Sequence, residues 1–101
     1  MTLEELQDII ATRAKASAQD SWTAKLLAQG NDKVAEKLGE EAIETVIEAV
    51  KGNKAGLTSE AADLIFHLLV VLHANELHIS DVLVELARRQ NQSGLAEKAA
   101  R

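Results

Sequence analysis

Residues 64–72 restrict the fold of this chain more than any other stretch of its sequence. These nine residues, LIFHLLVVL, are apolar on every side of a helix except at His67. A run of this length is too short to span a bilayer, so we expect a helix buried on all sides, either inside a bundle or between two subunits. Proline is absent, and 17 alanines and 14 leucines dominate the composition, so the rest of the chain is predicted to be helical too.

Capping residues and apolar spacing divide the chain into five predicted helices. Thr2 and Glu5 form a capping box, Ser21 caps a short second helix, and Gly30 and Gly52 end the second and third. We therefore expect one all-α domain over residues 1–101, an antiparallel bundle of four to five helices with a partly ordered tail from about residue 92. The expected helices cover residues 3–17, 22–28, 31–51, 57–75 and 82–90, the last capped by Ser80 and Asp81.

The charge and composition exclude several classes of function. The net charge is −5, which disfavours a general affinity for nucleic acid. No cysteine is present, so thiolate catalysis, cysteine-bound zinc and iron–sulfur clusters are excluded. The N-terminal sequence is acidic and no long apolar run follows, so we expect a cytoplasmic protein that does not associate with membranes.

An unusual run of acidic residues marks the third predicted helix. Glu36, Glu40, Glu44 and Glu48 follow one another at i,i+4, where like charges destabilise a helix by about 0.2–0.5 kcal/mol per step. A helix selected only for solubility would alternate glutamate with lysine. We therefore expect a positive group to compensate this row of charges.

The fourth predicted helix supplies two more carboxylates, Glu60 and Asp63, just before the apolar run. Because only a short linker separates the two helices, they should pack antiparallel with their acidic faces toward each other. Four or five carboxylates would then converge, and an all-oxygen site suits Mg²⁺ or Mn²⁺. The three histidines share no helical face and no Glu-x-x-His pair occurs, so zinc and di-iron sites are disfavoured.

A simpler interpretation stays open for each of these residues. The acidic faces are also explained as solvated surface, with Lys33, Lys37 and Lys51 forming ordinary pairs. His67 is either a core histidine or the donor of a hydrogen bond that orients Asp63. Gly39, which costs about 1 kcal/mol relative to alanine inside a helix, indicates close helix packing or room for a ligand.

At these residues the chain resembles a known family. The run SWTAKLLAQGNDKVAEKLGEEAIETVIEAVKGNK, then EAADLIFHLLVVL and DVLVELARR, is similar to phosphoribosyl-ATP pyrophosphatases, which are all-α nucleoside-triphosphate pyrophosphatases. The pattern E-E-x-x-E with E-x-x-D marks the superfamily, and S-W-T-A-K-L with A-A-D-L-x-F-H-L favours this branch. Tyrosine is common in the family where this chain has Trp22 and Phe66, and Glu36 stands where a base is frequent.

The resemblance implies an activity and a set of site residues. The expected reaction is metal-dependent hydrolysis of phosphoribosyl-ATP to phosphoribosyl-AMP and pyrophosphate, the second step of histidine biosynthesis, with Mg²⁺ as cofactor and Mn²⁺ as an alternative. We name Glu40 as the base that takes a proton from water. The resemblance assigns the metal to Glu41, Glu44, Glu60 and Asp63, and the candidate phosphate partners are Lys25, Lys33, Lys37, Arg88 and Arg89.

The resemblance also implies a homodimer, which agrees with the apolar run at residues 64–72. Two other functions stay open from the sequence. One is a pyrophosphatase of the same superfamily that removes dNTPs, because the carboxylate motif does not distinguish these substrates. The other is a helical dimerisation module without catalysis, in which the acids are only solvated.

Overall fold

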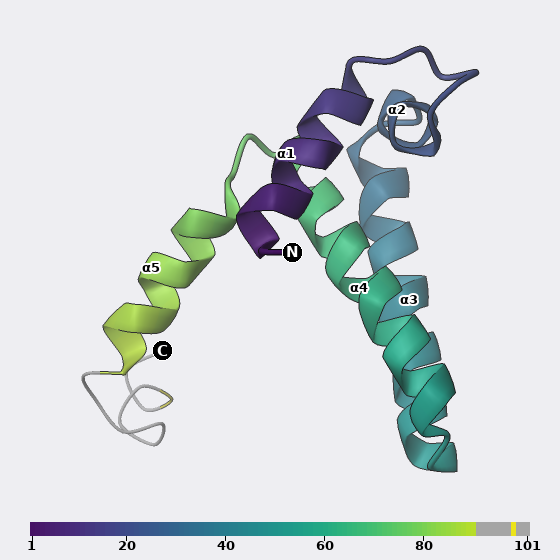
Figure 1. The fold of residues 1–101 in the computed structure, drawn as a ribbon, viewed down its shortest axis with the longest axis vertical. Helices are drawn as coiled ribbons and strands as arrows, with labels where there is room; N and C mark the ends of the chain where they lie inside the picture. Colours follow the sequence, from purple (N-terminus) through teal and green to yellow (C-terminus); the bar gives the residue numbers. More distant parts are fainter. Residues whose placement is uncertain (91–97, 99–101) are drawn as a thin grey trace.

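Two long antiparallel helices, α3 (Asn31–Lys51) and α4 (Lys54–Ala74), form the centre of the fold. The structure is a computed structural model, and it describes residues 1–90 and Lys98. Within them the chain is all-helical, with α1 (Leu3–Ala14) and α2 (Trp22–Ala28) packed at one end of the central pair. The last helix, α5 (Ile79–Arg89), contacts α1 and diverges from α4 (Figure 1). The prediction of an all-α fold is confirmed.

Local chemistry sets the helix ends largely as predicted. The Thr2–Glu5 capping box begins α1, the Ser21 hydroxyl caps α2, and Gly52 ends α3 in the left-handed conformation with φ 71°. Gly30, with φ 94°, separates α2 from α3, and only glycine adopts such a φ without strain. The predicted bounds of α2 and α3 are therefore confirmed.

Three other predicted helix ends are wrong. The first helix ends at Ala14 rather than near Ser17. The fourth begins at Lys54, three residues early, because the Asn53 side chain accepts a hydrogen bond from the Gly56 N–H and caps it. His78, not Ser80, caps α5, since its Nδ1 accepts from the Ser80 N–H at 3.0 Å. Asp81 completes that cap by accepting from the His78 N–H. The predicted tail, apart from Lys98, lies outside the described residues.

The buried core lies where α1, α2 and the C-terminal half of α4 meet. It is entirely aliphatic, and the far half of the α3–α4 pair extends beyond it (Figure 1). The expectation that residues 64–72 are buried on every side is not met within one chain, because Ile65 and Leu68 are exposed. The buried core residues are Ile10, Leu26, Val34, Leu69, Val70, Leu72 and Ile79.

At its full length of 21 residues, α4 is long and apolar enough to cross a membrane. The sequence suggested that the apolar run is too short to span a membrane, but the length of the whole helix removes that argument. Its surroundings still argue against a span, because α3 packs along α4 and both Glu60 and Asp63 lie on it. We interpret α4 as the central helix of the fold.

Candidate metal centre

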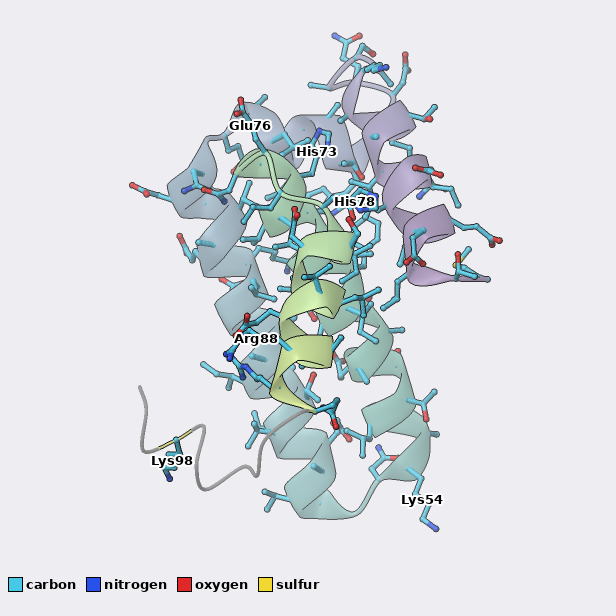
Figure 2. The ribbon with its side chains drawn as sticks, turned by 90° about the vertical axis from the view of Figure 1, so that its left-hand side faces the viewer. Lys54, His73, Glu76, His78, Arg88 and Lys98 are labelled. Carbon is cyan, nitrogen blue, oxygen red and sulfur yellow. The ribbon has the colours of Figure 1, made fainter. Side chains whose placement is uncertain are left out.

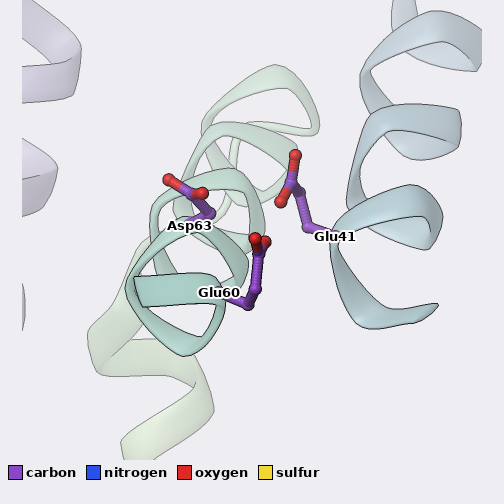
Figure 3. Close-up of side chains that lie close together, drawn as sticks. All are labelled: Glu41, Glu60 and Asp63. Atoms are coloured by element: carbon purple, nitrogen blue, oxygen red, sulfur yellow. The ribbon is translucent and has the colours of Figure 1, made fainter. Parts of the chain in front are cut away.

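Three carboxylates from the central helix pair converge. Glu41 on α3 and Glu60 and Asp63 on α4 each offer an oxygen, and these oxygens lie within 4.8 Å of one another (Figure 3). Glu60 and Asp63 share a face of α4 because they are three residues apart, and antiparallel packing brings Glu41 opposite them. The predicted convergence of acidic side chains from these two helices is confirmed for three carboxylates, where the sequence predicted four or five.

Glu41 is the most buried of the three, with 5% of the residue exposed. Burial alone would raise its pKa, but the Lys37 ammonium lies 3.2 Å from Oε1 and holds the pKa of Glu41 below its usual value. The other oxygen, Oε2, is buried and has no hydrogen-bond partner. Glu41 is therefore a desolvated carboxylate with one oxygen available for a ligand.

Glu60 has the most perturbed carboxyl group of the cluster. A hydrogen bond shared with Glu44, together with desolvation and the charges of Glu44, Glu41 and Asp63, raises the pKa of Glu60 to about 7. Its Oε2 is also buried without a partner. Glu44 is outside the group of three mutually close oxygens but contacts Glu60 directly. The four acids named from the resemblance thus lie together.

These residues fit a hard divalent cation. Two buried carboxylate oxygens have no partner, and leaving such groups unsatisfied costs free energy. Oxygen donors of this kind are the ligands that Mg²⁺ and Mn²⁺ prefer. A cation would satisfy both oxygens and relieve the repulsion that raises the Glu60 pKa.

Lysines compensate most of the acidic row on α3. Lys33 pairs with Glu36 at 3.2 Å, Lys37 with Glu40 at 3.5 Å, and Lys51 with Glu48 at 3.4 Å. These are the ordinary surface pairs of the simpler interpretation, so lysines and not a cation compensate these three glutamates. Exposed pairs of this type contribute little to stability.

The structure does not bring the other predicted site residues into the group of three carboxylates. Glu40, the proposed base, is half-exposed and outside the group of three. Lys33 and Lys37 border a hollow of about 160 Å³ that also includes Glu40, and Lys25 borders another hollow beside Trp22. Arg88 lies at the end of α5 (Figure 2). It and the neighbouring Arg89 both pair with Glu85.

His67 is buried, with 6% of the residue exposed, one turn after Asp63. Its Nδ1 lies 2.7 Å from the Asp63 backbone carbonyl, so this nitrogen carries the proton and donates. The contact is therefore with the main chain and not with the carboxylate that the sequence suggested. The Nε2 atom is buried and has no partner.

Gly39 does not support the packing explanation within this chain. A Cβ built there meets no atom within 4 Å. Close packing against another described helix of the same chain therefore does not explain this glycine. Open space for a ligand or a second chain remains as the explanation.

Together, the fold and the site define a class: all-α proteins whose central antiparallel helices present a carboxylate cluster suited to a hard divalent cation. Comparison with known proteins narrows this class. The family model described as phosphoribosyl-ATP pyrophosphohydrolase matches residues 3–90, which include the whole cluster. The chain belongs to this family.

Individual relatives align with this chain over nearly their whole length. A phosphoribosyl-ATP pyrophosphatase of Ruegeria pomeroyi is 59% identical, covering 98% of this chain and 94% of the relative. Those of Allorhizobium ampelinum and Sinorhizobium medicae are 58% and 55% identical, each covering 99% of this chain and 96% and 94% of the relative. The resemblance identified from the motifs is confirmed.

Proposed function

We propose that this chain hydrolyses phosphoribosyl-ATP between the α and β phosphates, giving phosphoribosyl-AMP and pyrophosphate in histidine biosynthesis. The match to the family over residues 3–90 carries this proposal. The chemistry of the site agrees with it, because hydrolysis of a phosphoanhydride requires neutralised phosphates and a positioned water rather than a covalent intermediate.

Glu41, Glu44, Glu60 and Asp63 are the residues that would hold Mg²⁺, with Mn²⁺ as the alternative. When bound, such an ion supplies positive charge to the polyphosphate. Lys37 keeps Glu41 ionised. Lys33 and Lys37 border a hollow beside the cluster, where their ammonium groups would donate hydrogen bonds to phosphate oxygens. Lys25, Arg88 and Arg89 are further candidates for phosphate contacts.

Glu40 is our candidate for the group that takes the proton of the attacking water. Its carboxylate is half-exposed and adjacent in sequence to Glu41, and Lys37 at 3.5 Å is its ion partner among the described residues. A solvent-facing carboxylate that is not occupied by metal can accept a proton. His67 would act indirectly, by keeping the α4 turn at Asp63 in place through its bond to the Asp63 carbonyl.

We also propose that the enzyme is a cytoplasmic homodimer. Four large apolar residues on α3 and three on α5 are exposed, far more contiguous apolar surface than scattered single residues would give. A second copy would cover them. The residues are Ile43, Val46, Ile47 and Val50 on α3, and Leu83, Val84 and Leu86 on α5.

The decisive experiment measures pyrophosphate release from phosphoribosyl-ATP and from a panel of dNTPs, each with Mg²⁺ and with EDTA. We expect release from phosphoribosyl-ATP that EDTA abolishes. Release from dNTPs but not from phosphoribosyl-ATP would contradict the substrate assignment and retain the class of reaction. No release from any of them would favour a non-catalytic helical module.

Thermal unfolding tests the metal separately from turnover. A ligand that binds only the folded state, at a hundredfold excess over its Kd, raises the free energy of unfolding by about 2.7 kcal/mol. We expect such a rise on titration with Mg²⁺ or Mn²⁺, and a smaller one for Glu60→Gln. An equal rise in both proteins would place the ion elsewhere.

A further inference from the structure

The two aromatic residues of this chain lie at the same hollow. The sequence contains one tryptophan, one phenylalanine and no tyrosine, and the core is aliphatic. Trp22 on α2 and Phe66 on α4 nevertheless border one cavity of about 400 Å³, together with Arg13, Asp20 and Thr23. We refer to this cavity as the aromatic hollow. Its volume falls within the range of small-molecule sites.

Trp22 is held at this hollow although it is not part of the core. Half of the residue is exposed. The preceding Ser21 hydroxyl donates to the Arg13 carbonyl at 3.0 Å and accepts from the Ala24 N–H at 3.1 Å, which ties the start of α2 to the end of α1. The loop is closed further by Ser17, whose hydroxyl donates to Asp20 at 2.8 Å. An indole fixed in this way, with one side to solvent, is preorganised for a flat ligand.

Phe66 connects the aromatic hollow to the carboxylate cluster. It follows Asp63 by three residues on α4, so the two side chains lie on adjacent turns of one helix face. The Phe66 ring is itself positioned by an edge-on contact with His67, with centroids 5.2 Å apart. Trp22 also borders the smaller hollow that contains Lys37 and Glu40. The indole therefore lies between the aromatic hollow and the smaller hollow that contains Lys37 and Glu40.

We propose that the aromatic hollow binds the adenine base of the substrate, stacked on the Trp22 indole and bordered by Phe66. This inference rests on the proposed function, since it places one part of phosphoribosyl-ATP. The phosphates then extend past Trp22 toward Lys37 and the carboxylates. Asp20, which is exposed, supplies a carboxylate at the edge of the hollow for a donor on the base.

Steady-state kinetics with phosphoribosyl-ATP test the stacking. Trp22→Leu keeps an apolar side chain but removes the flat ring, so we expect KM to rise about tenfold with little change in kcat. Trp22→Tyr should restore KM, and Ala28→Leu, on the exposed part of α2, serves as the control. An unchanged KM in Trp22→Leu, or a Trp22→Tyr variant as impaired as Trp22→Leu, would overturn the base site while leaving the activity established.

Intrinsic fluorescence provides a test that does not depend on turnover. Because Trp22 is the sole tryptophan, its emission reports on this position alone. We expect AMP to quench it in a saturable manner, inorganic pyrophosphate to leave it unchanged, and Phe66→Leu to weaken the AMP effect severalfold. Equal responses to AMP and pyrophosphate, or no response to AMP, would contradict the proposal. A wild-type chain that releases no pyrophosphate but shows the AMP response would refute the proposed function and support the base site.

Discussion

At the scale of single residues, Glu60 shows how the cluster stores electrostatic free energy. Its pKa is raised from 4.5 to about 7, so the folded state favours the neutral carboxyl. Because the folded pKa lies above the unfolded one, the stabilising contribution is complete below about pH 4.5 and is lost as the pH rises through 7. In the absence of metal, the cluster is therefore least favourable above about pH 7, where Glu60 is ionised.

The first prediction concerns the pH dependence of stability without metal. In Glu60→Gln the side chain at position 60 carries no charge at any pH. We therefore expect this variant to be more stable than the wild type, by a margin that grows as the pH rises from about 5 to 8. Urea unfolding in EDTA measures the difference, with Glu36→Gln as a control outside the cluster. A difference independent of pH would show that Glu60 titrates normally. Saturating Mg²⁺ should reverse the order, since the wild-type carboxylate then has a ligand.

The second prediction concerns the ligand residues. Glu44→Gln and Asp63→Asn each replace a charged oxygen by an amide of the same shape, so we expect turnover to be abolished while the circular dichroism spectrum stays that of the wild type. Glu4→Gln, at an exposed position on α1 outside the cluster, should keep its activity. A wild-type kcat in either of the first two variants would remove that position from the ligand set.

Sequence reasoning identified the carboxylates but not their individual environments. The i,i+3 and i,i+4 spacings place acids on helix faces regardless of tertiary detail, so the convergence of Glu41, Glu60 and Asp63 could be predicted. Which oxygen is buried depends on side-chain packing, and the bond from His67 to a main-chain carbonyl depends on its rotamer. The aromatic hollow was also missed. Its signal was present, since Trp22 and Phe66 are the two aromatic residues of the chain, but spacing does not show that they meet.

At the scale of elements, Gln7 joins α1 to the connection between α4 and α5 and to the start of α5. Its buried side chain on α1 donates to the Leu77 carbonyl at 3.0 Å and accepts from the Ile79 N–H at 2.6 Å. Leu77 lies in the connection between α4 and α5, and Ile79 is the first residue of α5, so this single amide satisfies two main-chain groups that lie outside the helical hydrogen-bond ladder. The direction in which α5 leaves α4 depends on it.

The third prediction follows from this contact. Gln7→Ala removes a donor and an acceptor and leaves two main-chain groups unsatisfied, so we expect a loss of about 2–4 kcal/mol in the free energy of unfolding. Chemical denaturation measures this loss, with the exposed Gln19→Ala as the matched control. Hydrogen exchange should also show faster exchange at Ile79 than in the wild type. A loss equal to that of the control would mean that water replaces the amide.

The helices themselves were predictable where caps and periodicity agreed. Ser21, Gly30 and Gly52 set the bounds of α2 and α3 because each satisfies a helix end or adopts a φ that other residues avoid. The start of α4 was missed because Asn53 lies in a segment that composition alone assigns to a linker. The cap at His78 was missed because histidine rarely takes this role, and its imidazole acts here in place of a hydroxyl.

At the scale of the whole molecule, the exposed apolar faces of α3 and α5 are the feature least expected of a domain that is soluble as a single copy. Val50 is 83% exposed, and it continues a row with Ile43, Val46 and Ile47 along α3. Within one chain, α1 and α2 reach only the other end of the central pair. Within the part of the chain that the structure describes, the row stays exposed, so we propose that a second copy of the chain covers it.

The fourth prediction tests that proposal. If a second copy covers α3, Val50→Lys buries a charge in an apolar interface, and we expect the dimer to dissociate and the melting temperature to fall. If the row faces water, the same change is nearly neutral, because surface substitutions alter stability by less than about 0.5 kcal/mol. Light scattering coupled to gel filtration distinguishes the two cases, with Thr12→Lys on the exposed side of α1 as the control. A wild-type mass of one chain would contradict the dimer. A Val50→Lys variant that stays dimeric and as stable as the wild type would show that the interface does not include the α3 row.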